Sequence, residues 1–252
     1  MLFQAHRGVS TEYPENTMPA FRAAWEQGYQ VIELDPVFTA DGQCVVFHDA
    51  TVNRTCRRAD LQVIQEPLKV TELTYEQLLS YDAGVFMGQQ FQGTRVPLLS
   101  QVLEFAREKD LLVKLDNKFE RFTPEQKEAF YAIVEASGAR VGFTCARLET
   151  VREVTKRFPK AEIHYDGLVT EENILAVKAL LAENPLTVWL ALPSRLTAWV
   201  KVPTATPELC QMVRRHAALG LWILETREQL QQALALNAHI IETTGSIKPM
   251  DN

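Results

Sequence analysis

The sequence predicts an α/β fold, a single (β/α)8 or TIM barrel, on the basis of three observations. Short apolar runs alternate with helical patterns along the chain, which is typical of βα units around a parallel sheet. Eight of these runs suit barrel strands, and most are rich in Val, Ile, Leu or aromatic residues, as strands covered on both faces are. The length of 252 residues is also typical of one such barrel, at about 250 residues.

The eight predicted strands are short and evenly distributed over most of the chain. They cover residues 2–5, 31–35, 112–116, 141–145, 161–165, 187–191, 220–224 and 239–242. In the connecting segments, apolar residues recur at helical spacing, in patterns that begin at Phe21, Leu99, Ile174 and Leu209. Thr-Pro-Glu sequences at Thr123 and at Thr206 place a capping residue and a proline where a helix starts.

The connection after the second strand departs from this alternation. Residues 38–46 predict a hairpin with Asp41 and Gly42 in the turn. About fifty residues separate this hairpin from the next long helical pattern, and Thr74 with Gln77 indicates a short helix with a capping box. Long βα loops usually serve a site. We therefore expect an insertion of about residues 50–97 over the barrel mouth, and, with no linker in view, a single domain over residues 1–252.

Composition and charge limit the class of protein. Hydrophobic residues make up 46% and charged residues 23% of the chain, as in ordinary globular proteins. The net charge of -6 argues against nucleic acid as a partner, because nucleic-acid binding usually leaves a basic footprint. No apolar run approaches the roughly 20 residues of a spanning helix, and no signal peptide is apparent, so we expect no stable membrane insertion. Four cysteines without metal-type spacing favour reduced thiols in a cytoplasmic protein.

Ionisable residues gather where the first three predicted strands and the hairpin end. They are His6, Arg7, Glu33, Asp35, His48, Asp116 and Lys118. In (β/α)8 barrels the active site lies at the carboxyl ends of the strands. We therefore expect these side chains to converge at one end of the barrel.

The three carboxylates in this set predict a metal site. Glu33 and Asp35 are two residues apart on one strand, so they should face the same side, and Asp116 with Lys118 should do likewise. Three carboxylates near one point repel each other unless positive charge compensates them. A hard divalent cation with oxygen ligands, Mg²⁺ or Ca²⁺, meets that need.

The remaining residues of the set indicate phosphoryl chemistry. Two imidazoles, His6 and His48, suit general acid–base catalysis because their ordinary pKa lies near neutral pH. Arg7 and Lys118 add the fixed positive charge that a phosphoryl transition state requires. Three other histidines, at positions 164, 216 and 239, are interpreted as structural.

Further residues near these motifs have more ordinary interpretations. Glu15 and Asn16 suit a helix start, because Asn is a favoured N-cap. Trp222 is interpreted as a residue of the core or of a pocket wall, and Trp189 and Trp199 as packing residues.

The motifs together resemble those of one known family. His6-Arg7-Gly8, Pro14-Glu15-Asn16-Thr17, Glu33-x-Asp35, His48-Asp49 and Arg54-Thr55 are similar in order and spacing to the glycerophosphodiester phosphodiesterases. The resemblance is strong to about residue 118 and weak beyond it. It implies that His6 and His48 are the acid–base pair, that Glu33, Asp35 and Asp116 bind the metal, that Arg7 and Lys118 contact phosphate, and that Trp222 lines the pocket.

Two departures from the family pattern affect this interpretation. The family's third metal ligand is Glu, whereas Asp116 is one methylene shorter. The closing Ile-Thr-Asp-x-Pro pattern of the family is replaced by residues 241–245, in which Glu242 stands at the position of Thr, and Ile223 replaces the Thr that usually follows Trp222. The substrate end of the pocket is therefore expected to differ.

The resemblance implies metal-dependent hydrolysis of a small-molecule glycerophosphodiester to sn-glycerol 3-phosphate and an alcohol. A lysophospholipase D-like enzyme on the same barrel is one alternative, with Val85, Phe86, Met87 and Phe91 as the lining of an apolar groove. A barrel that binds phosphodiesters without hydrolysing them is another. The preferred alcohol, the choice between Mg²⁺ and Ca²⁺, the roles of the two histidines and the oligomeric state stay open.

Overall fold

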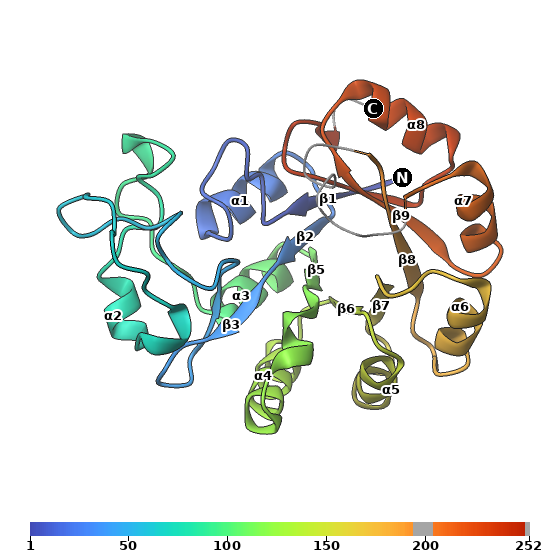
Figure 1. The fold of residues 1–252 in the computed structure, drawn as a ribbon, viewed down its shortest axis with the longest axis horizontal. Helices are drawn as coiled ribbons and strands as arrows, with labels where there is room; N and C mark the ends of the chain where they lie inside the picture. The colour runs from blue at the N-terminus through green and yellow to red at the C-terminus, as the bar shows by residue number, and fades with distance from the viewer. Residues whose placement is uncertain (194–203, 250–252) are drawn as a thin grey trace.

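The computed structural model describes residues 1–193 and 204–249, so that Trp199 lies outside the described residues. Its eight parallel barrel strands are β1 (Leu2–His6), β2 (Val31–Leu34), β5 (Leu112–Leu115), β6 (Val141–Cys145), β7 (Glu162–Tyr165), β8 (Leu186–Ala191), β9 (Ala218–Leu224) and β10 (Ile240–Thr243). They close into a barrel in the order β1-β10-β9-β8-β7-β6-β5-β2, with helices around the outside (Figure 1). The predicted (β/α)8 barrel is confirmed.

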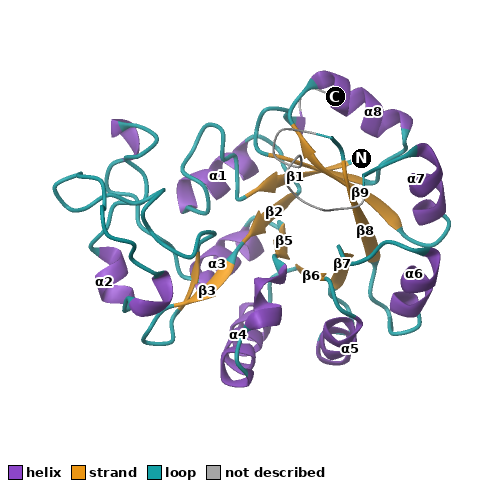
Figure 2. Cartoon of the chain, in the orientation of Figure 1, coloured by secondary structure: helices purple, strands orange, loops and turns teal. Residues whose placement is uncertain are grey.

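The outer layer consists of helices that alternate with the strands in Figure 2. They are α1 (Met18–Glu26), α3 (Leu99–Glu108), α4 (Pro124–Ser137), α5 (Leu148–Arg157), α6 (Glu171–Lys178), α7 (Pro207–Arg214) and α8 (Arg227–Ala235). The apolar spacing predicts four of them, α1, α3, α6 and α7. The predicted starts are confirmed, because Thr123 and Thr206 each accept a hydrogen bond from the third backbone N–H of their helix. Helix α7 ends at Arg214, two residues before His216.

The predicted hairpin after β2 is also confirmed. Strands β3 (Pro36–Phe38) and β4 (Cys44–Val46) pair antiparallel. Gly42 in the turn has a φ of 77°, a conformation that glycine adopts without a steric penalty. The short helix α2 (Tyr75–Leu79) begins with the expected capping box between Thr74 and Gln77.

The segment between β4 and α3 has a small hydrophobic core of its own. Two 3-10 helices, η1 (Val70–Glu72) and η2 (Gln89–Phe91), accompany α2 there, and the segment lies to one side of the barrel in Figure 1. Together with Val45 of β4, this core contains Phe47, Val52, Cys56, Ile64, Val70, Leu78, Ala83 and Val96. The single domain and the insertion bounds of about residues 50–97 stay predictions.

The barrel interior is unusually polar, and this feature positions the site. Branched apolar side chains fill most such barrels, but here the buried set includes Gln4, Glu33, Lys114, Thr144, His164, Thr187 and Glu242. Two glycines leave space for two large side chains of the interior, His164 and Trp189. A Cβ at Gly142 would lie 2.4 Å from His164 Nε2, and one at Gly220 would lie 2.6 Å from the Trp189 ring. No described helix combines the length and the apolar character that crossing a membrane requires.

Candidate active site

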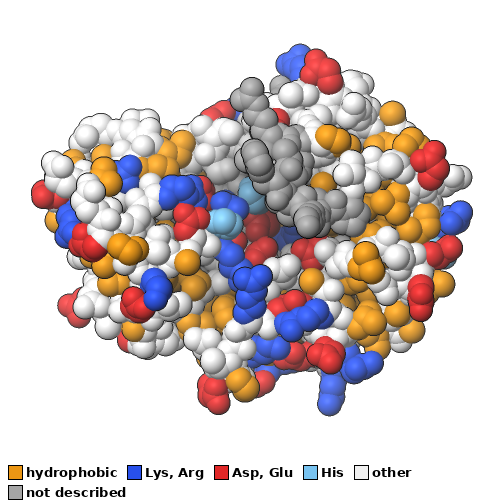
Figure 3. Space-filling view, in the orientation of Figure 1, with side chains coloured by type: hydrophobic (Ala, Val, Ile, Leu, Met, Phe, Trp, Pro, Cys, Tyr) orange, Lys and Arg blue, Asp and Glu red, His pale blue; other side chains and the backbone are white. Residues whose placement is uncertain are grey.

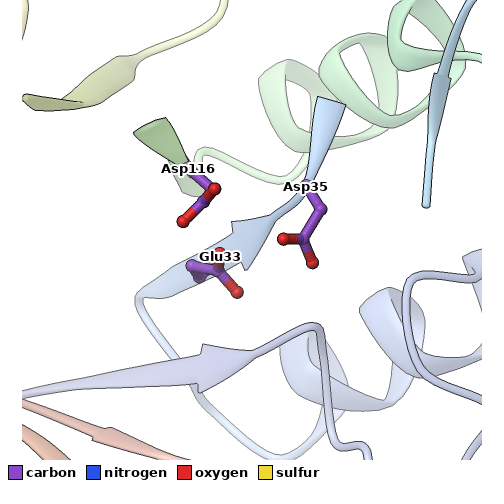
Figure 4. A group of neighbouring side chains, drawn as sticks. All are labelled: Glu33, Asp35 and Asp116. Atoms are coloured by element: carbon purple, nitrogen blue, oxygen red, sulfur yellow. The ribbon is translucent and has the colours of Figure 1, made fainter. Parts of the chain in front are cut away.

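Three carboxylates meet at the carboxyl end of the barrel, where charged and histidine side chains line a hollow in the surface (Figure 3). Glu33 belongs to β2, Asp35 follows it, and Asp116 follows the neighbouring strand β5. One oxygen from each carboxylate lies within 4.8 Å of the others, and Figure 4 shows the three groups on the ends of the two strands. The structure thus brings the three predicted metal ligands together.

Asp116 reaches the cluster by a different local geometry from the one expected. Strand β5 ends at Leu115, and Asp116 is the N-cap of the 3-10 helix η3 (Asn117–Arg121), where its Oδ1 accepts a hydrogen bond from Lys118 N at 3.1 Å. The expectation that Asp116 and Lys118 share one face of a strand is therefore wrong. The turn nevertheless brings Lys118 Nζ to 2.8 Å from Asp35 Oδ1, and the same ammonium donates to the His48 carbonyl.

Arg7 connects two of the carboxylates with the rim of the site. Its backbone N–H donates to Glu33 Oε2 at 3.1 Å, and its guanidinium lies 3.3 Å from Asp35 Oδ2 and 3.0 Å from Glu15 Oε1. The residue has a φ of 56°, and Gly8 follows it with a φ of 78°. A Cβ at Gly8 would lie 2.7 Å from Ala20. The turn that aims Arg7 into the site therefore requires glycine at the next position.

Asn16 is a site residue that the sequence interpretation missed. It is not the N-cap of α1, which is Thr17. Its buried side chain donates from Nδ2 to Asp35 Oδ2 at 2.7 Å, and its backbone has a φ of 57°. Asp35 is thus held by Asn16, Arg7 and Lys118 together. The sequence did contain a signal for a role of Asn16 in the site. Asn16 belongs to the Pro-Glu-Asn-Thr motif, and a helix start alone does not require all four of these residues.

The three carboxylates differ in how their charge is compensated. Burial would raise the pKa of Asp35, but Lys118 and Arg7 outweigh it and lower that pKa. Burial, followed by the charge of Asp35, raises the pKa of Glu33 well above its usual range and raises that of Asp116. In the part of the chain that the structure describes, no Lys or Arg side chain is ion-paired with Glu33 or Asp116. An all-oxygen group with uncompensated charge fits a hard divalent cation.

The two predicted catalytic histidines lie beside this cluster in different environments. His6 Nε2 is 4.0 Å from Glu33 Oε2. Burial, reinforced by Arg7 and opposed by Glu242, lowers the pKa of His6 from 6.5 to about 4. His48 is more exposed, at 36%, and its Nδ1 lies 2.7 Å from Asp49 Oδ1. The Asp49 contact leaves Nε2 as the ring nitrogen that can face a substrate.

A network of ion pairs fixes the rim next to His48. Arg54 lies 2.6 Å from Asp49 Oδ2 and 2.7 Å from both carboxylate oxygens of Glu15. Glu15, interpreted from sequence as part of a helix start, therefore joins Arg7 and Arg54. Through these pairs the loop that carries His48 is tied to the loop that follows β1.

A cavity of about 100 Å³ lies inside the barrel next to the cluster. Its lining consists of His6, Glu33, Lys114, Asp116, Thr144, Asp166, Trp189, Trp222 and Glu242. Trp222 thus lies in a pocket wall, and Trp189, expected only to pack, lines the same cavity. Larger cavities of about 410 and 450 Å³ include Leu112 and Arg140 in their lining, at the opposite end of the strands, and contain no predicted site residue.

Two of the other histidines lie outside the cluster. His164 is fully buried, and its Nδ1 accepts a hydrogen bond from Trp189 Nε1 at 3.0 Å. Burial, followed by the charge of Lys114, lowers its pKa well below the usual value. His216 contacts Glu171 at 2.7 Å, away from the barrel mouth. The structural interpretation of both histidines stays a prediction.

Comparison with known proteins places the chain in a family. The model of the glycerophosphoryl diester phosphodiesterase family matches residues 6–241, so the chain belongs to that family. It is 42% identical over 114 residues to a glycerophosphodiester phosphodiesterase of Caldanaerobacter subterraneus, a match that covers 45% of this chain and 44% of the relative. A glycerophosphodiester phosphodiesterase of Bacillus altitudinis is 36% identical over 121 residues, covering 47% and 46%. The chain thus matches less than half the length of these curated relatives.

Solved structures resemble the whole barrel. A phosphodiesterase from Oleispira antarctica, solved in complex with the product sn-glycerol-3-phosphate, has a TM-score of 0.76 at 16% identity and covers 98% of this chain and 94% of that one. A glycerophosphodiester phosphodiesterase from Agrobacterium tumefaciens has a TM-score of 0.69 at 21% identity, covering 97% and 96%. At these identities the likeness establishes the fold.

Proposed function

We propose that the protein is a metal-dependent phosphodiesterase that hydrolyses glycerophosphodiesters to sn-glycerol 3-phosphate and an alcohol. One observation gives this proposal its main support. The buried carboxylates of Glu33, Asp35 and Asp116 converge within 4.8 Å, beside His6 and His48, in a chain that belongs to the glycerophosphoryl diester phosphodiesterase family.

Glu33, Asp35 and Asp116 would hold the divalent cation, Mg²⁺ or Ca²⁺. All three offer carboxylate oxygens, the donors that both ions prefer. When bound, the cation supplies positive charge that stabilises the charge developing on the phosphoryl oxygens. The shorter Asp116 is compatible with this role, since its carboxylate already lies within the cluster.

Arg7 and Lys118 provide fixed positive charge for the phosphate. Both are held in place by Asp35, at 3.3 and 2.8 Å, and Lys118 is also bound to the His48 carbonyl. Preorganised donors of this kind stabilise a phosphoryl transition state without reorganising during the reaction. The planar guanidinium of Arg7 suits two phosphate oxygens at once.

The environments of the two histidines support an assignment of their roles. The buried His6 ring is neutral at pH 7, as a general base must be, because its pKa is about 4. The Nδ1 of His48 is engaged by Asp49, which orients the ring so that its Nε2 is left for the substrate. With water as the nucleophile, His6 takes a proton from the water as its oxygen bonds to phosphorus. His48 gives a proton to the alcohol oxygen as the bond between that oxygen and phosphorus breaks.

The alternative activities have less support. A lysophospholipase D-like enzyme needs an apolar groove, but Phe91 packs against Tyr13 with ring centroids 5.5 Å apart. The cavity beside the cluster and the cavities of about 410 and 450 Å³ are lined by residues other than Phe86, Met87 and Phe91. A non-catalytic barrel has no need for two imidazoles beside the carboxylates.

The proposal is tested by a coupled assay for sn-glycerol 3-phosphate released from glycerophosphocholine, with EDTA and with added Mg²⁺ or Ca²⁺. We expect chelation to abolish turnover and one of the two ions to restore it. His6→Ala and His48→Ala should each lower kcat at least about 100-fold, whereas His216→Ala, a matched control outside the site, should not. Turnover that survives chelation would refute the metal site, and normal turnover by either histidine variant would refute the acid–base pair. Cleavage of lysolipids alone would favour the lysophospholipase D-like alternative.

A further inference from the structure

The guanidinium of Arg54 binds two carboxylates of the rim at once. Its Nε and Nη2 donate to Asp49 Oδ2 and Oδ1 at 2.6 and 3.0 Å, and its Nη1 and Nη2 donate to Glu15 Oε2 and Oε1 at 2.7 Å each. Both pairs are bidentate, a geometry that only the planar guanidinium offers among the cationic side chains. Arg54 belongs to the Arg-Thr motif of the sequence, for which the proposed mechanism has as yet no role.

A continuous chain of contacts runs from His48 to Arg7 through this guanidinium. His48 Nδ1 lies 2.7 Å from Asp49 Oδ1, the oxygen that also accepts from Arg54 Nη2. At the other end, Arg7 Nη1 donates at 3.0 Å to Glu15 Oε1, which accepts from the same Arg54 nitrogen. Arg54 therefore contacts both carboxylates that orient the proposed general acid and the proposed phosphate ligand.

Burial alone does not fix the His48 end of this chain. The side chains of His48 and Asp49 are 36% and 24% exposed. Exposed side chains change rotamer rapidly unless hydrogen bonds hold them. Ion pairs at this exposure contribute little to stability. We therefore expect the loss of Arg54 to change the geometry of the site more than the stability of the fold.

The segment between β4 and α3 fixes the backbone of Arg54. Val52 and Cys56, two residues before and after it, are fully buried in the small hydrophobic core of this segment. Cys56 N donates to the Val52 carbonyl at 2.9 Å, and the Arg54 carbonyl accepts from Arg57 Nη1 at 3.3 Å. A segment that lies beside the barrel thus takes part in the site by supplying the guanidinium that binds its rim.

We propose that Arg54 is a positioning residue that aligns the general acid His48 with the phosphate ligand Arg7. Through Asp49 it keeps Nε2 of the His48 ring toward the leaving alcohol, and through Glu15 it keeps the Arg7 guanidinium toward the phosphate. The inference rests on the proposed function, because it takes the roles of His48 and Arg7 from it. A lysine in place of Arg54 would keep the charge but lose the fork that spans both carboxylates.

The test compares two esters of sn-glycerol 3-phosphate whose leaving groups differ in their need for a proton. Choline must be protonated as it leaves glycerophosphocholine, whereas p-nitrophenolate leaves the p-nitrophenyl ester as a stable anion. We expect Arg54→Met to lower kcat about tenfold or more on glycerophosphocholine and less than about threefold on the p-nitrophenyl ester. KM should rise about threefold or more on both esters, because Arg7 is loosened. Arg54→Lys should behave like Arg54→Met, since it lacks the fork.

Variants of the two carboxylates separate the two branches. Asp49→Asn should reproduce the loss of kcat on glycerophosphocholine with little change in KM, because its amide nitrogen cannot accept a hydrogen bond. Glu15→Gln should reproduce the rise in KM on both esters and leave the ratio of their kcat values unchanged. The matched control is Arg58→Met, which removes an exposed pair with Glu66 in the same segment and should leave both esters unaffected.

The tautomer of His48 gives a readout that does not depend on turnover. The Asp49 carboxylate can only accept, so the neutral wild-type ring carries its proton on Nδ1. We expect ¹⁵N NMR to show a shift toward the Nε2–H form in Arg54→Met. An equal effect of Arg54→Met on kcat for the two esters, or an unchanged tautomer, would overturn the proposal. A wild-type protein that cleaves neither ester, with the tautomer shift present in the variant, would contradict the proposed function and leave the positioning role standing.

Discussion

Lys114 and Glu242 form an ion pair inside the barrel, with Lys114 Nζ 3.2 Å from Glu242 Oε2 and both residues less than 10% exposed. Strands β5 and β10 carry the two residues and are not neighbours in the sheet, so the pair crosses the interior. Burial would lower the pKa of Lys114 and raise that of Glu242, but their neighbours, with the mutual attraction of the pair foremost, together outweigh burial in both cases. Gln4 donates a further hydrogen bond to Glu242.

Breaking this pair from one side should destabilise the protein strongly. We expect Lys114→Met or Glu242→Gln alone to lower the free energy of unfolding by about 3–5 kcal/mol, because each leaves a buried group without its partner. The double variant Lys114→Met/Glu242→Leu should lose less than the sum of its single changes. Urea unfolding measures both. Lys69→Met, which removes an exposed pair with Glu72, is the control and should change the free energy of unfolding by less than about 1 kcal/mol. Single variants as stable as wild type would show that the pair does not contribute.

Replacing one carboxylate of the cluster should separate metal affinity from stability. We expect Asp116→Asn to weaken Mg²⁺ binding roughly tenfold or more, since it removes a charged ligand. In EDTA the same variant should raise the melting temperature, because Asp35 and Glu33 no longer face a third negative charge. Calorimetric titration and thermal unfolding provide the two readouts, and Asp60→Asn on the surface is the control. Unchanged Mg²⁺ affinity in Asp116→Asn would remove Asp116 from the ligand set.

The rim network should give the protein a defined acid sensitivity. His48 and Arg54 hold the pKa of Asp49 below its usual value, and Arg54 and Arg7 outweigh burial to lower that of Glu15. A carboxylate with a lowered pKa stabilises the fold above its unfolded pKa, here 3.8 for Asp49 and 4.5 for Glu15, and that stability is lost as the pH falls below these values.

Arg54→Met should therefore reduce the free energy of unfolding at pH 7 by about 1 kcal/mol, a modest loss because Arg54 is half exposed. The difference between wild type and variant should shrink as the pH falls below about 4.5. Denaturant unfolding at pH 7, 5, 4 and 3 measures this trend. A difference that stays constant across the series would show that these carboxylates are not linked to Arg54.

The glycine beneath the site should not tolerate a methyl group. Gly142→Ala would place a Cβ 2.4 Å from His164 Nε2, so we expect a loss of about 1–3 kcal/mol in the free energy of unfolding. In a His164→Ala background the same change should cost much less, because the clashing ring is gone. A double-mutant cycle by urea unfolding gives the coupling between the two positions. Equal costs in both backgrounds would show that the ring is not the cause.

Much of the site could be predicted from the sequence because its signals are local. Strand ends in a parallel barrel share one edge, so ionisable residues that follow strands must converge there. On this basis Glu33, Asp35 and Asp116 were placed together, and the structure has them within 4.8 Å. The family resemblance rested on motifs before residue 118, and a family model that matches residues 6–241 confirms it.

The supporting contacts could not be predicted in this way. Asn16 belonged to a motif, but its hydrogen bond to Asp35 depends on a left-handed turn that the chain makes before α1. Lys118 was expected on a strand and instead reaches Asp35 from a 3-10 turn. Backbone conformations at the ends of elements follow from their tertiary surroundings, and periodicity does not encode them.

The sequence by itself determined the barrel, the family and the ionisable residues at its mouth, because apolar periodicity and strand-end spacing act over a few residues. Only the tertiary structure decided how those charges are compensated and what shape the inner cavity takes. Lys114 and Glu242 lie on strands β5 and β10, which are distant in the sequence and not adjacent in the sheet. Their contacts depend on barrel closure, which turns side chains from separate strands into one enclosed interior.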